Sequence, residues 1–219
     1  MLVLFLLFFV LLASAGAYWV YQSAQTIPEF YQAALSLDEE VADVEGDEFE
    51  KRVLNLQNDA RSKSEWQAIF TEAQVNGWIA SDMPEKFPDS LPQIVEDPRV
   101  VMLPQNLKLA MRVKSGRFEG ILIASTDVFC TEDGRIGVRI KTVSVGVLPI
   151  PIAQFADRIA DAIRSAGVDV EWTETEGDPV ALLKLPKDFF EFEGVHARPT
   201  GIEIEEGKVI LSGETKEEP

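Results

Sequence analysis

The sequence predicts an α+β protein in which an N-terminal transmembrane helix and a helical stalk precede a curved antiparallel sheet packed on an amphipathic helix. Three observations predict this class. A continuous apolar run opens the chain, segments with helical spacing follow, and segments that alternate apolar and polar residues begin near residue 107. Turn pairs between successive alternating segments favour hairpins, and hairpins pair strands antiparallel.

The charge of the chain is strongly acidic and unevenly placed. Its 219 residues include 20 Lys and Arg against 37 Asp and Glu, a net charge of −17, and no charged residue precedes Glu29. An acidic chain repels phosphates, which argues against nucleic-acid binding. A hydrophobic content of 46% argues against intrinsic disorder. No second apolar run approaches the length of a membrane span, which excludes a polytopic membrane protein.

Residues 1–22 are predicted to be a membrane anchor. Residues 2–20 form an apolar run that, as a helix, spans about 28 Å, close to one bilayer core. Aromatic rings that favour the headgroup layer close the run: Tyr18, Trp19 and Tyr21. A cleaved signal peptide is the alternative, because small residues at 13–15 and 15–17 resemble cleavage sites. A buried core helix is a third interpretation.

The flank of this run predicts its orientation. Eight acids and no base lie between Asp38 and Glu50, and the first base is Lys51. Cytoplasmic flanks usually carry Lys and Arg. We therefore expect a single-pass protein of the cytoplasmic (inner) membrane, with its domain on the extracytoplasmic or periplasmic side. The single Cys130 permits no intramolecular disulfide and leaves the redox compartment undecided.

An acidic helical stalk is predicted over residues 23–65. Pro28 starts a short helix, and Ser36 with Glu39 resembles a capping box that opens a longer helix over residues 37–63. Gly46 is a predicted break or weak point of that helix, and residues 64–70 are predicted to connect it to the next one.

The extracytoplasmic α+β domain is predicted over residues 66–213. Thr71 and Gln74 form a second capping box before a short helix that Pro84 and Pro88 end. The proline-rich residues 83–104 predict a loop with at most one strand, at 99–103.

The remainder predicts strands and one amphipathic helix. Strands are expected at 107–113, 118–130, 136–147, 168–172 and 180–185, with a final hairpin at 202–211. A bulge is predicted near Thr142, where the apolar parity changes. The amphipathic helix is predicted at residues 152–164. About seven strands result, and the tail 214–219 is predicted to fray.

Little in the sequence predicts chemistry. His196 is the only histidine, and neither it nor Cys130 has a nucleophile or base partner nearby; a surface histidine and a buried thiol are the expected roles. The acidic run lacks the spacing of an EF-hand, and no phosphate-binding glycine motif occurs. We therefore expect no enzyme, no catalytic residue, no metal ligand and no cofactor.

The apolar residues of the strands are the main functional signal. Residues 121–123 and 145–152 are apolar at successive positions, so they place apolar side chains on both faces of the sheet. The amphipathic helix covers one face, and the other face must be buried by something else. The N-terminal helices, a partner or a lipid chain would each supply such a cover. The candidate ligand groove comprises Leu109, Met111, Ile121, Ile123, Val138, Ile140, Phe155 and Ile159.

Three segments resemble a known family. They are FTEAQVNGWI at 70–79, EDGR at 132–135 and SVGVLPIP at 144–151. Over residues 66–163 the chain resembles the YpmS-type family of uncharacterised, membrane-anchored bacterial proteins. That family's pattern is similar to tubular lipid-binding (TULIP-like) domains, whose long curved sheet wraps a helix and lines an apolar groove. The resemblance implies an extracytoplasmic domain and no catalytic residues.

These observations predict a non-enzymatic envelope protein that binds a lipid or another hydrophobic ligand. The alternative is a structural or scaffold protein that binds an envelope partner through its acidic helices. A hydrolase, the third interpretation, would require His196 or Cys130.

Overall fold

The computed structural model describes residues 26–88, 91–116, 118–151, 169–184 and 195–217, together with Tyr18, Gln22, Ser23, Glu191 and Phe192. About 30% of the described residues are helical and 51% are in strands, and the sheets are antiparallel, which confirms the mixed class. The predicted amphipathic helix at 152–164, with Phe155 and Ile159, lies outside the described residues. So does the predicted anchor at 1–22, apart from Tyr18 and Gln22. None of the described helices has the length and apolar character that a bilayer crossing requires.

Four described helices lie in the first part of the chain. They are α2 (Glu29–Leu35), α3 (Glu39–Ser62), α4 (Glu72–Ala80) and α5 (Asp82–Lys86). Asp38, rather than the predicted Ser36, caps α3, because its side chain accepts from the backbone N–H of Glu40. The capping box of Thr71 and Gln74 at the start of α4 is confirmed.

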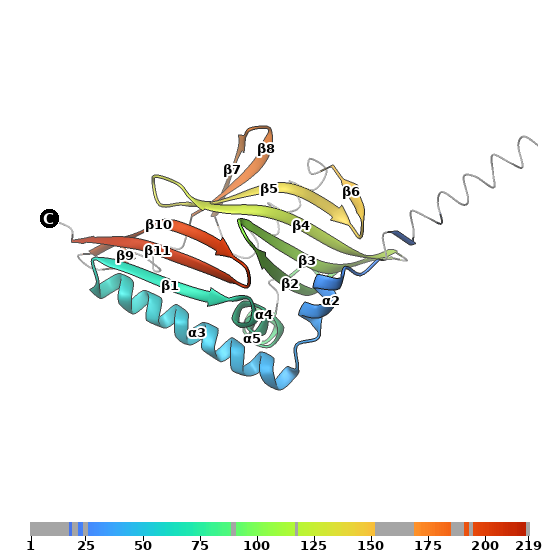
Figure 1. Ribbon diagram of the computed structural model, residues 1–219, viewed down its shortest axis with the longest axis horizontal. Helices are drawn as coiled ribbons and strands as arrows, with labels where there is room; N and C mark the ends of the chain where they lie inside the picture. Colours follow the sequence, from blue (N-terminus) through green and yellow to red (C-terminus); the bar gives the residue numbers. More distant parts are fainter. Residues whose placement is uncertain are drawn as a thin grey trace, which may run out of the picture.

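The strands form two antiparallel sheets instead of the single sheet predicted. The four-stranded sheet has the order β1-β11-β10-β9: β1 (Glu65–Thr71), β11 (Lys208–Glu217), β10 (Val195–Glu205) and β9 (Glu191–Phe192). The seven-stranded sheet has the order β2-β3-β4-β5-β8-β7, and β6 pairs with the end of β5. Its strands are β2 (Val95–Leu103), β3 (Asn106–Ser115), β4 (Phe118–Cys130), β5 (Ile136–Val145), β6 (Leu148–Ile150), β7 (Asp169–Thr175) and β8 (Asp178–Lys184). Figure 1 shows the two sheets side by side.

Two segments that were not predicted as strands create the second sheet. Residues 64–70, predicted as a connector, contain most of β1, which pairs with β11 from Glu65↔Glu214 to Thr71↔Lys208. Residues 214–217, predicted as part of a frayed tail, belong to β11 and pair with β10 as well. The segment at 64–70 gains its structure from a partner far away in the sequence, so local periodicity carries no sign of it, whereas residues 214–217 mainly extend the hairpin with β10.

Three details of the seven-stranded sheet test the turn and bulge predictions. The register between β4 and β5 shifts so that Thr142 faces Ser125 while Ile140 faces Thr126, which leaves Lys141 as the extra residue and confirms the bulge. Gly134 closes the β4–β5 connection with a φ of 81°. β2 is longer than the predicted 99–103 and begins at Val95.

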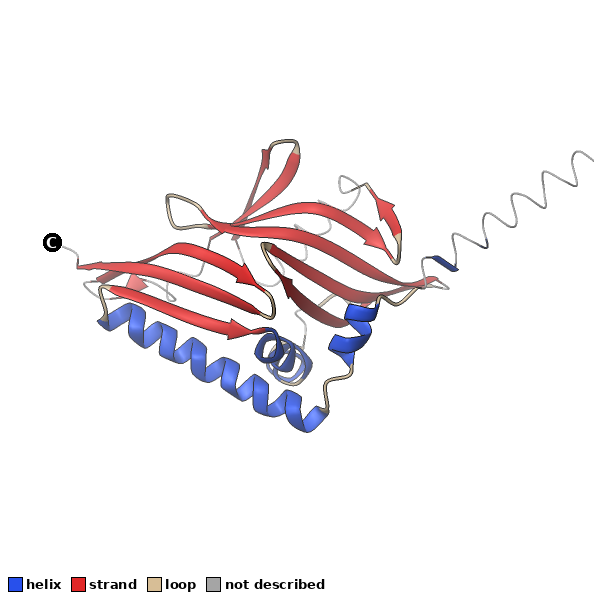
Figure 2. Ribbon diagram, viewed as in Figure 1, coloured by secondary structure: helices blue, strands red, loops and turns tan. Residues whose placement is uncertain are grey.

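Helices α2, α3 and α4 each cover a different part of the sheets (Figure 2). Leu56 and Ala60 of α3 pack against Trp66 and Phe70 on one face of the four-stranded sheet. Tyr31 of α2 packs on Ala110 and Ile121 of the seven-stranded sheet. Helix α4 lies where the two sheets meet, and its apolar residues Val75 and Ile79 contact strands of both. The helix predicted as a stalk therefore contributes to the core.

Glycines let α3 and α4 cross closely. A Cβ at Gly77 would lie 2.7 Å from the carbonyl oxygen of Ala42 and 2.8 Å from the Cβ of Glu45. A Cβ at Gly46 would lie 3.3 Å from the Cα of Trp78 in α4. The prediction of a helix break at Gly46 is wrong, because α3 continues through it from Glu39 to Ser62.

Candidate functional site

The outer edge of β2 is closed by side chains from α4. In an antiparallel edge strand, every second residue points its N–H and C=O away from the neighbouring strand. The amide of Asn76 donates to the carbonyl of Val100 and accepts from its N–H, both at 2.8 Å. Oε2 of Glu72 accepts from the N–H of Met102 at 2.7 Å. Glu72 and Asn76 are four residues apart on one helix face. The length that separates them along the helix is close to the length that separates every second residue along a strand, so the two side chains can reach Met102 and Val100.

Two further groups complete this closure. The N–H of Gly207, in the β10–β11 turn, donates to the carbonyl of Met102 at 3.0 Å. The hydroxyl of Tyr31 donates to the carbonyl of Asp97 at 2.7 Å, at a bulge where Asp97 has a φ of 50°. The polar residues of the TEAQVN segment thus have structural roles. Among the described residues, the β2 edge therefore leaves no row of unpaired N–H and C=O groups with which a ligand or another strand could pair.

The edge of β10 is left more open. It pairs with β9 only at Val195 and His196, and the remainder of that edge forms no ladder within the part of the chain that the structure describes. Instead, β4 of the other sheet lies beside it, and Val128 packs near Ile202 and Ile204. Two hydrogen bonds tie the two sheets here. The N–H of Gln105 donates to the carbonyl of Ile204 at 2.9 Å, and the guanidinium of Arg198 donates to the carbonyl of Glu132 at 3.0 Å. We call this junction of β4 and β10 the seam.

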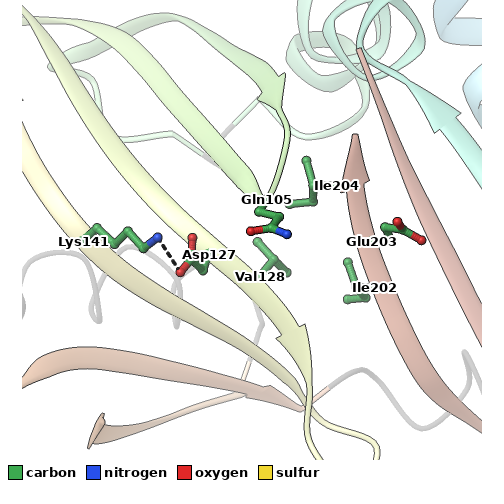
Figure 3. A pocket seen from close by; sticks show the side chains of 7 residues that line it. All are labelled: Gln105, Asp127, Val128, Lys141, Ile202, Glu203 and Ile204. Carbon is green, nitrogen blue, oxygen red and sulfur yellow. Dashed lines mark ion pairs between the residues drawn. The ribbon is translucent and has the colours of Figure 1, made fainter. Parts of the chain in front are cut away.

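A recess of about 320 Å³ opens at the seam and is the candidate site (Figure 3). Its wall is apolar: Val128 faces Ile202 and Ile204. Its rim is polar, with Gln105 at the β2–β3 turn and the Asp127–Lys141 pair on β4 and β5. Glu203 also borders the recess, but its side chain points to the other side of β10.

The ion pair at the rim depends on the β5 bulge. Lys141 is the extra residue of that bulge, and its ammonium lies 2.7 Å from Oδ2 of Asp127. The other carboxylate oxygen, Oδ1, is buried and meets no donor among the described residues. An ammonium group has three donors, so Lys141 retains hydrogen-bonding capacity beyond Asp127. The recess therefore combines an apolar wall with one half-exposed cation at its rim.

The structure divides the predicted groove residues between two faces of one sheet. Side chains that are partnered across an antiparallel ladder share a face, and neighbours along a strand alternate. By this register, four of the candidates lie on the face that meets α4 and β10: Leu109, Met111, Val138 and Ile140. Ile121 and Ile123 lie on the opposite face, which α2 covers. The register therefore does not bring all six described candidates together, and a groove lined by the first four stays a prediction.

Sequence reasoning did not identify the recess residues. Gln105, Asp127 and Lys141 belong to the seven-stranded sheet, and Ile202 and Ile204 belong to the four-stranded sheet. They line one recess only because the two sheets lie side by side. One local signal pointed to the region: the parity change near Thr142 marked the bulge that positions Lys141.

The two reactive side chains lie elsewhere. Cys130 ends β4 and is half-buried, and burial raises the pKa of its thiol, which disfavours the nucleophilic thiolate. His196 is exposed on β10, opposite Lys216 of β11. Within the described ranges no three His, Cys, Asp or Glu side chains are grouped to hold a metal ion.

Comparisons of the chain with family models, with curated proteins and with solved structures return no match.

Proposed function

We propose that the chain is a membrane-anchored extracytoplasmic protein that binds a lipid or another hydrophobic ligand without catalysis, and that the ligand's apolar chain enters the recess at the seam. The supporting observation is the juxtaposition of an apolar wall and a polar rim at the part of the β10 edge that forms no ladder with any described strand. Most ligand sites have this composition, with a few polar groups that orient the ligand.

The size and charge of the recess narrow the ligand class. A volume of about 320 Å³ is at the lower end of the range for small-molecule sites, so it suits one narrow chain better than a whole diacyl lipid. The ammonium of Lys141 favours an anionic headgroup such as a carboxylate or a phosphate. A single-chain anionic amphiphile, for example a fatty acid, meets both requirements.

Uptake of a fluorescent fatty acid by the purified full chain tests the proposal, with native mass spectrometry for co-purifying lipid. Ile202→Trp would fill the recess and should weaken uptake at least about tenfold. Ile210→Trp is the matched control, because Ile210 pairs with Glu203 and lies on the other face of the same sheet. Equal uptake by both variants, or none by the original chain together with no bound lipid, would contradict the proposal.

A charge variant separates headgroup recognition from the fold. Lys141→Glu keeps an exposed polar residue at the bulge and should weaken binding of a fatty acid. The same variant should retain binding of an uncharged monoacylglycerol. If both ligands are affected alike, Lys141 does not recognise the headgroup.

A scaffold role remains the second candidate because α3 exposes Val41, Val44 and Leu54 among its acidic residues. Partner capture with Val44→Lys and Leu54→Lys tests it. Deleting α3 is unsuitable, since Leu56 and Ala60 belong to the core. Loss of a partner with fatty-acid uptake intact would favour the scaffold role.

A further inference from the structure

One end of the seven-stranded sheet gathers the start of β2, the β3–β4 turn and the β5–β6 turn. The N–H of Lys114, near the end of β3, donates to the carbonyl of Ile94 at 2.8 Å, which continues the β2–β3 ladder by one residue. The N–H of Gly146, just after β5, donates to the carbonyl of Ile121 at 2.7 Å. Ile94 and Val147 therefore lie at the same end of the sheet, which we call the tip.

The N-terminal part of the chain reaches the domain at the tip. The N–H of Val147 donates to the carbonyl of Ser23 at 3.3 Å, and Ser23 is buried. Residues 26–28 continue from there into α2, whose Tyr31 is fully buried against Ala110 and Ile121. Figure 1 shows α2 lying against β2 and β3.

The tip exposes large apolar side chains. The exposed fractions are 44% for Ile27, 44% for Ile94 and 60% for Val147. Tyr18, whose hydroxyl accepts from the side chain of Gln22 just before Ser23, is 65% exposed. Single exposed apolar residues are ordinary, but a group of them where one segment enters a domain indicates an interaction surface.

The sequence that precedes the tip indicates which partner covers it. The apolar run at 2–20 ends three residues before Ser23, and three extended residues span at most about 10 Å. If that run crosses the bilayer, as the proposed function holds, the tip must lie within about this distance of the membrane surface. Apolar side chains at that depth can bury themselves at the boundary of headgroups and acyl chains.

The charges at the tip are compatible with such a contact. The guanidinium of Arg112 lies 2.8 Å from Glu119 and lowers the pKa of that carboxyl by hydrogen bonding. The ammonium of Lys114 lies 2.6 Å from Glu96. Arg112 also lies 3.6 Å from Asp97, so two bases offset most of the charge of three described acids, which reduces their repulsion by an anionic leaflet.

We propose that the tip, with Ile27, Ile94 and Val147, rests in the headgroup layer of the bilayer, so that the domain is held against the membrane by its surface as well as by the anchor. This inference relies on the membrane attachment in the proposed function and is independent of the recess. The bilayer fits the tip better than a protein partner does, because the chain itself delivers the tip to the membrane surface.

Site-directed fluorescence in vesicles tests the proposal on the full chain. Val147→Cys and Ile94→Cys, each in a Cys130→Ser background, would carry an environment-sensitive dye in vesicles of phosphatidylethanolamine and phosphatidylglycerol. Val44→Cys on α3 is the matched control, because Val44 is 61% exposed, almost the same as Val147. Spin-labelled lipids in the headgroup region should quench the tip dyes about twofold and leave the Val44 dye nearly unchanged.

The outcomes separate this inference from the proposed function. If the chain resists alkaline extraction from the vesicles but the dyes at 94 and 147 are quenched no more than the control, the tip does not contact lipid and the inference fails alone. If the chain does not stay with the vesicles at all, the proposed anchoring fails as well. Energy transfer between tip dyes on different chains, with no quenching by the spin-labelled lipids, would show that a second copy of the chain covers the tip. That result would also overturn the inference.

Discussion

The edges of β2 and β10 show two ways to end a sheet. Along β2, the outward groups of Val100 and Met102 are all satisfied, by Asn76, Glu72 and the N–H of Gly207. Along β10, one backbone hydrogen bond from Gln105 and one side-chain hydrogen bond from Arg198 join the strand to the other sheet, and a recess lies beside the edge. The first edge is closed by specific polar contacts, whereas the second is covered mainly by packing. A closed edge should be costly to disturb, and an open one should tolerate change.

The largest effect is expected from Asn76→Leu. Asn76 is only 3% exposed, and its loss would leave the buried N–H and C=O of Val100 without partners. We expect a loss of about 3 kcal/mol in the free energy of unfolding. Chemical denaturation of the full chain measures it. Asn55→Leu on the exposed side of α3 is the control and should change stability by less than about 0.5 kcal/mol. Equal losses would mean that the amide does not close the edge.

Gly77→Ala tests whether α4 must lie this close to α3 to hold Asn76 in place. The added Cβ would meet backbone and Cβ atoms of α3, whose positions cannot adjust as a flexible side chain does. We expect a loss of about 2 kcal/mol, although alanine favours a helix over glycine. Thermal unfolding measures it, with Asn55→Ala as the control for helix preference. A stabilised Gly77→Ala variant would show that the crossing is looser than the structure indicates.

Tyr31→Phe should have a smaller effect that depends on pH. Burial, then the negative charge of Asp97, raises the pKa of Tyr31 above its ordinary value of 10.0. The folded state thus favours the neutral phenol, so this contribution is complete below pH 10 and is lost as pH rises through the raised pKa. Removing the hydroxyl also removes the bond to Asp97, at a cost of about 1 kcal/mol near neutral pH.

Denaturation at pH 7 and above pH 10 checks this prediction. When the pH is raised from 7 to above 10, the free energy of unfolding of the original chain should fall by more than that of the Tyr31→Phe variant. An identical alkaline loss in both would show that other groups control it.

The smallest effect on stability is expected at the open edge. Lys141→Met removes a half-exposed ion pair, and such pairs contribute about 0.5 kcal/mol or less. Fatty-acid binding should nevertheless weaken, because the cation at the rim is lost. Denaturation and uptake on the same sample measure both effects. A loss of stability as large as that of Asn76→Leu would remove the distinction between the two edges.

Several elements were predictable because their causes are local. The capping box at Thr71, the bulge near Thr142 and the bounds of β4 each depend on residues a few positions apart. The cap of α3 was misplaced by two residues because both Ser36 and Asp38 are suitable capping residues. Backbone geometry decides which of two nearby candidates caps a helix, and the types of residue in the sequence do not show that geometry.

The sequence by itself determined the acidic character, the apolar N-terminal run, most strands and the antiparallel pairing of neighbours. Only the tertiary structure decided that β1 joins β11, that Asn76 and Glu72 close the β2 edge and that β10 lies beside β4. The physical reason is the range of the interactions. Turns, caps and alternation arise from backbone preferences over a few residues, whereas strand edges and recesses arise where distant segments compete for the same partner.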